Sequence, residues 1–324
     1  MKNRITEILG IKYPIASGGM AGVSDGPFAA AVSEAGGLGT IGAFKESGEG
    51  LTREIMRLRQ LISKPFAVNI PLIVPQVEEL IASAIENLVP VVVTAAGNPA
   101  VYTKRLQDSR IRVIHVAPCV DLARRAEDAG VDAVIAEGFE SGGFASPYEI
   151  GTLALVPQVV DALGIPVLAA GGICDSRGYA ACLILGAEGV SVGTAFLLTR
   201  EACRVGPAWS RQMLEGGDAC TKIVARHASP FRALINSYTA SFEERIAQGA
   251  SKKQIVGEII SSDWGGDEDG LFTCGQAVGL IKRIRTVQEV IEEFVSGSQM
   301  ILERAAQMLC TEPENSDGAI HSRK

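Results

Sequence analysis

Two glycine-containing segments in the second half of the chain have the residue types and spacing of a phosphate-binding site. Residues 169–172 (AAGG) end in two glycines, and Gly193 and Thr194 follow after 20 intervening residues, enough for one helix and one strand. Barrels of parallel strands commonly bind phosphate through the turns after their last two strands, so this pair predicts a phosphate group. The Thr194 hydroxyl could contact that phosphate or cap the helix that follows. The alternative is that these glycines only form tight turns.

Eight short apolar runs, separated by stretches with helical periodicity, would position these segments. Strands buried on both faces of a parallel sheet have this continuous apolar character, and helical crossovers join such strands. Eight of them favour a closed (β/α)8 TIM barrel over an open doubly wound sheet, and the length of 324 residues leaves room for an insertion. The predicted strands are 14–17, 38–41, 66–70, 91–94, 112–116, 133–136, 166–169 and 189–192.

The rest of the chain predicts a helical insertion after the eighth strand. Residues 201–263 are charged and helix-like and contain no convincing strand, whereas 287–308 has the pattern of one long amphipathic helix. We therefore expect a barrel from 1–200 and 270–310, with 201–269 as a helical lid over its mouth. The polar tail, 311–324, is expected to be disordered.

Composition favours a cytoplasmic enzyme that acts on a small molecule. The chain is 47% hydrophobic and 21% charged, which excludes a disordered protein. A net charge of −7 and only 5% aromatic residues argue against nucleic acid or an anionic membrane as partner. The seven cysteines form no C-x-x-C pair, so no metal site is predicted. We expect no secretion signal and no membrane span, and a homodimer is left open.

The residues expected at the carboxyl ends of the strands are mostly small or expose their backbone. Active sites of such barrels lie at these ends, and a mouth of this kind lets a large flat ligand approach the backbone closely. The residues are 18–20 (GGM), Asn69, 95–98 (AAGN), His115, Glu137, Gly138, Gly171, Gly172, Gly193 and Thr194.

A set of short motifs, taken together, resembles one enzyme family. Their order and spacing are similar to those of the FMN-dependent nitronate monooxygenases (2-nitropropane dioxygenases) and the related enoyl-acyl-carrier-protein reductases II, over nearly the whole chain to residue 308. The motifs are IASGGM (15–20), AGGLG (35–39), FAVNI (66–70), TAAGNP (94–99), DAVIAEGFESGG (132–143), AAGGI (169–173), GAEGVSVGTAF (186–196) and GQAVGL (275–280).

The resemblance implies one FMN, held without a covalent bond in the barrel mouth, and a nicotinamide donor, NADH or NADPH. It assigns the FMN phosphate to Gly171, Gly172, Gly193 and Thr194. It places Gly19, Met20, Asn69 and Gln276 along the ring and ribityl chain, with a tight loop at Gly142 and Gly143 near the ring. Asn and Gln side chains can satisfy ring heteroatoms, although loop capping is the alternative role for Asn69 and Gln276.

One position departs from the family. The family commonly carries a catalytic His directly after the glycine pair of the loop that follows the sixth strand, and this chain has Phe144 there. A phenyl ring cannot take or give a proton, which predicts poor nitronate oxidation if that reaction needs the imidazole. Phe144 would either lie against the flavin and narrow the pocket or simply pack under the lid.

Few side chains could replace the missing imidazole. His115 is expected to face the mouth at the end of the fifth strand, with a hydrogen-bonded core role as the alternative, and His227 lies in the insertion. Tyr148 is a further candidate proton donor. Glu137 would orient a loop amide or, with its pKa raised by burial, act as an acid beside the flavin. Arg232 would either bind an anionic substrate or nucleotide phosphate, or cap a helix.

Several functions remain open from the sequence. The first is an FMN oxidoreductase that passes a hydride from a nicotinamide to an activated alkene, an enoyl thioester or a quinone. The second is oxygen-dependent nitronate oxidation. The third is a non-redox barrel enzyme for a phosphorylated metabolite, but no predicted strand end carries the Lys that such enzymes usually need. The fourth is a catalytically silent flavin protein, which Phe144 leaves possible.

Overall fold

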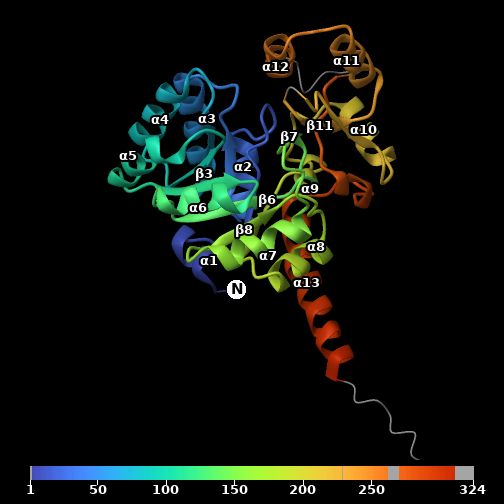
Figure 1. Ribbon diagram of the computed structural model, residues 1–324. Helices are drawn as coiled ribbons and strands as arrows, with labels where there is room; N and C mark the ends of the chain where they lie inside the picture. The colour runs from blue at the N-terminus through green and yellow to red at the C-terminus, as the bar shows by residue number, and fades with distance from the viewer. Residues whose placement is uncertain (1, 228, 262–269, 311–324) are drawn as a thin grey trace, which may run out of the picture.

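The computed structural model describes residues 2–227, 229–261 and 270–310, and its core is the predicted TIM barrel (Figure 1). Eight parallel strands are hydrogen-bonded in the order β1-β9-β8-β6-β5-β4-β3-β2. A parallel bridge between Ala16 and Leu38 joins the first and last strands of this order and closes the barrel. The strands are β1 (Ile15–Ser17), β2 (Gly39–Gly42), β3 (Phe66–Pro71), β4 (Val91–Ala95), β5 (Arg112–Ala117), β6 (Ala133–Glu137), β8 (Val167–Ala170) and β9 (Gly189–Val192).

Helices surround the barrel and connect its strands. The helix after β9, α9 (Thr194–Leu197), is too short to cover the barrel, and α13 (Val287–Cys310) packs against α8 and α2 in its place. The predicted long C-terminal helix is therefore confirmed. The outer helices are α2 (Gly26–Glu34), α3 (Gly48–Leu61), α4 (Val77–Glu86), α5 (Thr103–Asp108), α6 (Val120–Asp128), α7 (Thr152–Ala162) and α8 (Ser176–Ile184), with a 3-10 turn, η1 (Pro99–Val101), before α5.

Alternate residues of each strand divide between two apolar cores. Ile114 and Val116 of β5 belong to the barrel interior, whereas Val113 and Ala117 pack outward against the helices. Helix α1 (Arg4–Leu9) contributes Ile5 and Leu9 to the interior core. The period of two residues thus decides which strand side chains can reach a ligand in the mouth.

The insertion contains strands as well as helices, so the prediction that it has none is wrong. Strands β10 (Thr221–Val224) and β11 (Phe231–Leu234) form an antiparallel hairpin, and β11 also pairs with β7 (Gly143–Phe144). Pairing with a segment nearly ninety residues earlier leaves no local signal in the sequence. The helices of the insertion are α10 (Pro207–Glu215), α11 (Ser237–Ala247) and α12 (Lys252–Ser261), which lie above the barrel in Figure 1.

Two further predictions concern the tail of the chain and membrane-spanning helices. The predicted disorder of 311–324 and the end of the predicted insertion, 262–269, lie outside the described residues. The helices within the described ranges include none that is both long and apolar enough to cross a bilayer.

Candidate functional site

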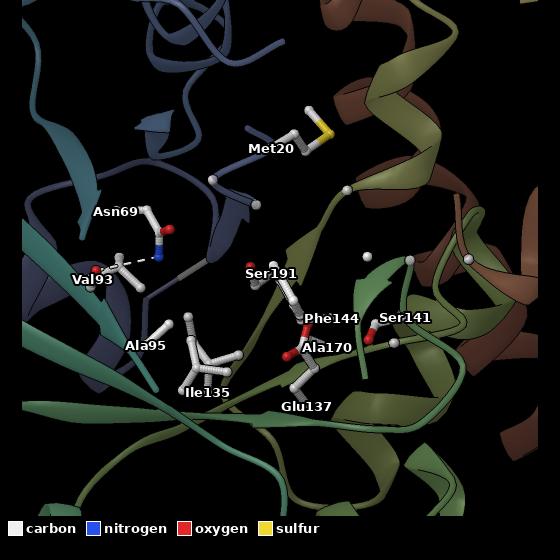
Figure 2. A pocket seen from close by; sticks show the side chains of 18 of the residues that line it. Met20, Asn69, Val93, Ala95, Ile135, Glu137, Ser141, Phe144, Ala170 and Ser191 are labelled. Atoms are coloured by element: carbon white, nitrogen blue, oxygen red, sulfur yellow. Dashed lines mark hydrogen bonds between the residues drawn. The ribbon is translucent and has the colours of Figure 1, made fainter. Parts of the chain in front are cut away.

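A cavity of about 420 Å³ lies at the mouth of the barrel, and Figure 2 shows the side chains around it. Its floor is formed by inward-facing residues of the strands, among them Val93, Ile135 and Ala170. The turns after β1, β6, β8 and β9 and the segment before the 3-10 helix η2 (Gln276–Leu280) form its walls. Segments distant in sequence therefore meet in one hollow at the end of the barrel where active sites are found.

The two predicted phosphate-binding turns line this cavity side by side. Strands β8 and β9 are neighbours, and Gly171, Gly172, Gly193 and Thr194 all contribute to the wall. Gly171 and Gly172 have φ angles of 95° and 70°, a region that favours glycine. A Cβ on Gly171 would also come within 2.8 Å of the carbonyl oxygen of Gly138, so the tight turn alone accounts for this glycine.

Thr194 connects the cavity wall to the segment before η2. Its Oγ1 accepts a hydrogen bond of 2.8 Å from the backbone N–H of Gly275, which leaves the hydroxyl hydrogen able to donate elsewhere. Gly275 also lines the cavity, and a Cβ there would stand 2.7 Å from the Glu140 carbonyl oxygen. The turn after β9 therefore keeps a hydroxyl donor next to the glycine pair.

Gly19, Met20 and Asn69 line another wall. A Cβ on Gly19 would lie 2.2 Å from the Cβ of Asn69, so only glycine permits this close approach. The Asn69 Nδ2 donates to the Val93 carbonyl oxygen at 3.3 Å, the interaction dashed in Figure 2. This bond fixes the orientation of the amide and leaves its Oδ1 to accept a hydrogen bond from a ligand.

Phe144 stands at the edge of the cavity within an aromatic cluster. Its ring centroid is 5.1 Å from that of Phe231, nearly perpendicular to it, and 5.7 Å from that of Phe44. All three rings line the cavity. Gly143, just before it, has a φ of 80° and open space where a Cβ would be, which allows the loop to approach a ligand. Where the family motif has an imidazole, this chain therefore has an apolar surface.

Glu137, at the end of β6, carries the one carboxyl group among the described residues that line the cavity, and none of them is His, Lys, Arg or Tyr. Burial raises the pKa of this half-buried carboxyl to about 7, and a hydrogen bond with Ser141 opposes the rise. Figure 2 shows Glu137 and Ser141 beside Phe144. Near neutral pH the site thus holds a carboxyl that is partly protonated.

His115 does not face the mouth, so that expectation is wrong. The neighbours Ile114 and Val116 point into the barrel, which turns the imidazole outward toward the helices. The side chain is 4% exposed, and its Nδ1 lies 2.8 Å from the Thr94 hydroxyl oxygen. Burial lowers the pKa of His115 to about 4, so the ring is neutral at physiological pH. His115 lines a second cavity, between the ends of β4 and β5 and helix α6.

Three other candidates are not brought into the cavity. The side chains of Tyr148, His227 and Gln276 are exposed, and none of the three lines the cavity. Gln276 contributes a backbone N–H that donates to the Glu140 carbonyl oxygen at 2.9 Å. This contact holds the segment before η2 against the loop after β6.

Arg232 is 2% exposed and does not line the cavity either. Its guanidinium donates to the Phe139 carbonyl oxygen at 3.1 Å and to the Thr221 hydroxyl at 3.3 Å, and it lies 5.2 Å from the centre of the Phe139 ring. Burial lowers its pKa. The cap of the following helix, α11, is Asn236 and not Arg232. Arg232 instead fastens the hairpin to the loop after β6.

Four residues that line the cavity were not predicted from the sequence, namely Phe44, Ser141, Phe231 and Thr273. Phe231 immediately precedes Arg232, but its orientation depends on a strand pairing that the local sequence does not reveal. Ser141 lies within the motif that the sequence singled out and is therefore the one member that could have been found.

Comparisons with known proteins show that the chain is similar to one enzyme family. A family model described as nitronate monooxygenase matches residues 2–89 and 76–297. The chain is 39% identical over 247 residues to a probable nitronate monooxygenase of Staphylococcus aureus strain MSSA476, which covers 62% of this chain and 69% of that protein.

Solved structures extend the similarity over nearly the whole chain. FabK from Thermotoga maritima is 38% identical, with a TM-score of 0.90 over 95% of this chain and 99% of that one. A nitroalkane oxidase from Streptomyces ansochromogenes is 26% identical, with a TM-score of 0.80 over 94% of this chain and 100% of that one.

Proposed function

We propose a function from one premise, which is that this chain belongs to the nitronate monooxygenase family. This family and the similarity to FabK identify the protein as an oxidoreductase. We propose that it binds FMN and uses NADH or NADPH to reduce an activated alkene, an enoyl thioester or a quinone. The observation that carries the proposal is that the glycine turns after β8 and β9 share one cavity with Asn69, Glu137 and Phe144.

The residues present fit an FMN. Gly171, Gly172, Gly193 and Thr194 would hold the phosphate through backbone amides and the free hydroxyl hydrogen of Thr194. Gly19, Met20 and Asn69 would lie along the ring and ribityl chain, where the unused Oδ1 of Asn69 can accept a hydrogen bond. When bound, FMN supplies hydride-transfer chemistry, so the protein need not present a charged constellation.

Reduction of a polarised double bond consumes one hydride and one proton, and this chain must supply or relay the proton. Glu137 holds a proton near neutral pH in the cavity, and Ser141 is hydrogen-bonded to it. Phe144, Phe44 and Phe231 present an apolar aromatic surface to the same cavity. Glu137 is therefore the proposed proton-holding group in place of the family's imidazole.

Nitronate oxidation is the second candidate, and it is favoured by one observation, the similarity to curated probable nitronate monooxygenases. Nitronates are small anions, and the described lining of the cavity contains no cationic side chain to attract them. Phe144 also occupies the position where the family commonly has its catalytic His. We therefore place this activity second.

The test begins with the absorption spectrum of the purified protein, which should contain the bands of an oxidised flavin. Anaerobic addition of NADH or NADPH should bleach those bands, and an enoyl thioester or a quinone should restore them. Propyl-2-nitronate with oxygen should be turned over slowly by the native protein and faster by Phe144→His. A colourless protein that does not take up FMN would contradict the proposal, and rapid nitronate turnover by the native protein would reverse the order of the two candidates.

A further inference from the structure

Glu140 lies behind the wall of the cavity, in the loop that follows β6, and does not line the cavity itself. Both of its carboxylate oxygens accept from the backbone N–H of Thr152, each at 2.9 Å, and Thr152 is the first residue of α7. The N-cap residue of this helix, Gly151, has no side chain that could accept such a bond. Glu140 therefore caps α7 from a distant part of the chain, where the positive end of the helix dipole favours a carboxylate.

Thr152 connects this carboxylate to the glycine turn after β8. Its hydroxyl lies 2.9 Å from Oε2 of Glu140 and 3.0 Å from the Gly171 carbonyl oxygen, with a longer contact of 3.3 Å to the Ala170 carbonyl oxygen. A trans peptide directs its C=O and N–H to opposite sides, so the bond to Gly171 turns the Gly172 N–H away from α7. Gly172 lines the cavity, and its N–H donates to no residue that the structure describes. The turn therefore holds a backbone donor that the fold itself does not use.

The backbone of Glu140 is connected to the other glycine turn, the one after β9. Its carbonyl oxygen accepts from the Gln276 N–H at 2.9 Å. The preceding N–H, that of Gly275, donates to Oγ1 of Thr194 at 2.8 Å. Since Oγ1 of Thr194 accepts here, its hydroxyl hydrogen remains able to donate to a ligand. Two adjacent backbone amides thus connect Glu140 to the hydroxyl donor of the second turn.

We propose that Glu140 is a positioning residue for the phosphate of the bound nucleotide. It acts through Thr152 on the Gly172 N–H and through the backbone of 275–276 on the Thr194 hydroxyl, and it does not touch the ligand. Donors that are already oriented bind an anion more tightly, because no free energy is lost in ordering them. This inference rests on the proposed function. It adds that the preference for a phosphorylated flavin depends on residues outside the cavity.

The ratio of the affinities for FMN and riboflavin isolates this effect, because the two flavins differ only in the phosphate. Fluorescence titration of the full-length protein, after removal of its flavin, would measure both dissociation constants. Thr152→Val keeps the shape of the side chain but not its hydroxyl, and should reduce the preference for FMN about fivefold, the equivalent of one hydrogen bond. Thr152→Ser retains the hydroxyl and should keep the native preference. Glu140→Ala removes the carboxylate and should reduce the preference at least as much as Thr152→Val.

Thr103→Val is the matched control. Thr103 is also the buried first residue of an outer helix, α5, and its hydroxyl donates to a backbone carbonyl oxygen, that of Pro99, at 2.8 Å. It does not line the cavity. Thr103→Val should therefore lower the urea midpoint in the same way as Thr152→Val but leave the preference for FMN unchanged.

A merely structural role of Glu140 predicts a different result, in which both flavins lose affinity by the same factor. The proposal is overturned if Thr152→Val and Glu140→Ala give that result, or if they leave both dissociation constants unchanged. A native protein that binds neither flavin would contradict the proposed function and this inference with it. A native preference for FMN that survives both substitutions would refute the inference alone.

Discussion

Replacing Glu137 with Gln should change how the stability of the protein depends on pH. The carboxyl has an ordinary pKa of 4.5 in the unfolded chain, and burial raises it to about 7 in the folded protein. Below pH 4.5 both states carry the proton, so the carboxyl imposes no ionisation penalty. Between the two pKa values folding takes up a proton, and stability falls as the pH rises.

The size of the effect follows from the two pKa values. At about 1.4 kcal/mol per pKa unit, the rise from 4.5 to about 7 gives a loss of about 3 kcal/mol, complete above the folded pKa. Gln has nearly the same shape and does not ionise. The difference in unfolding free energy, Glu137→Gln minus native, should therefore shift by about 3 kcal/mol in favour of the variant between acidic and mildly alkaline pH.

Urea unfolding of both flavin-free proteins, followed by circular dichroism at a series of pH values, would measure this difference. Using the difference cancels the titration of every other group that the two proteins share. Glu140→Gln is not a suitable control, because both Glu140 oxygens accept from the Thr152 backbone N–H. Parallel stability curves for the native protein and Glu137→Gln would refute the raised pKa and with it the role of Glu137 as a proton store.

Four substitutions test other parts of the reasoning by their unfolding free energies. Gly19→Ala forces a Cβ to within 2.2 Å of Asn69 and should cost about 1–3 kcal/mol and reduce FMN uptake. A Cβ at Gly143 meets no neighbour, but the residue has a φ of 80°, so Gly143→Ala should cost about 1–2 kcal/mol. If Gly19→Ala and Gly143→Ala reduced FMN uptake equally, the steric argument for Gly19 would be contradicted. Asn236→Ala removes the cap of α11 and should cost about 1 kcal/mol, seen first as faster proteolysis of the insertion. Arg232→Lys should cost about 1.5–3 kcal/mol, and an unchanged urea midpoint would show that its two hydrogen bonds are dispensable.

The barrel could be predicted from the sequence because its signals are local. Each strand is a short apolar run bounded by turn residues, and the positive φ angles at Gly171 and Gly172 account for the glycine pair. The same locality explains why the two glycine turns after β8 and β9 could be predicted to lie next to each other. In a parallel barrel, strands adjacent in sequence place their following turns side by side.

The failures concern features that depend on distant partners or on exact register. The orientation of His115 changes with a shift of one residue, because alternate side chains of a strand face opposite sides. The β10–β11 hairpin depends on pairing with Gly143 and Phe144. The positive charge of Arg232 suggested that it binds a substrate. In the fold its hydrogen-bond partners are the Phe139 carbonyl oxygen and the Thr221 hydroxyl, and no sequence pattern identifies these contacts.

The pairing of β11 with β7 links the insertion to the cavity. Phe231 pairs with Phe144, and the Ala145 N–H donates to the Pro230 carbonyl oxygen at 2.9 Å, so the hairpin and the loop that carries Phe144 share one backbone ladder. Local opening of the hairpin must release Phe144 as well. A ligand that packs against this ring will therefore slow amide hydrogen exchange in β10 and β11, at 221–224 and 231–234. Sequence changes in the insertion will alter affinity in the barrel mouth without touching the ligand.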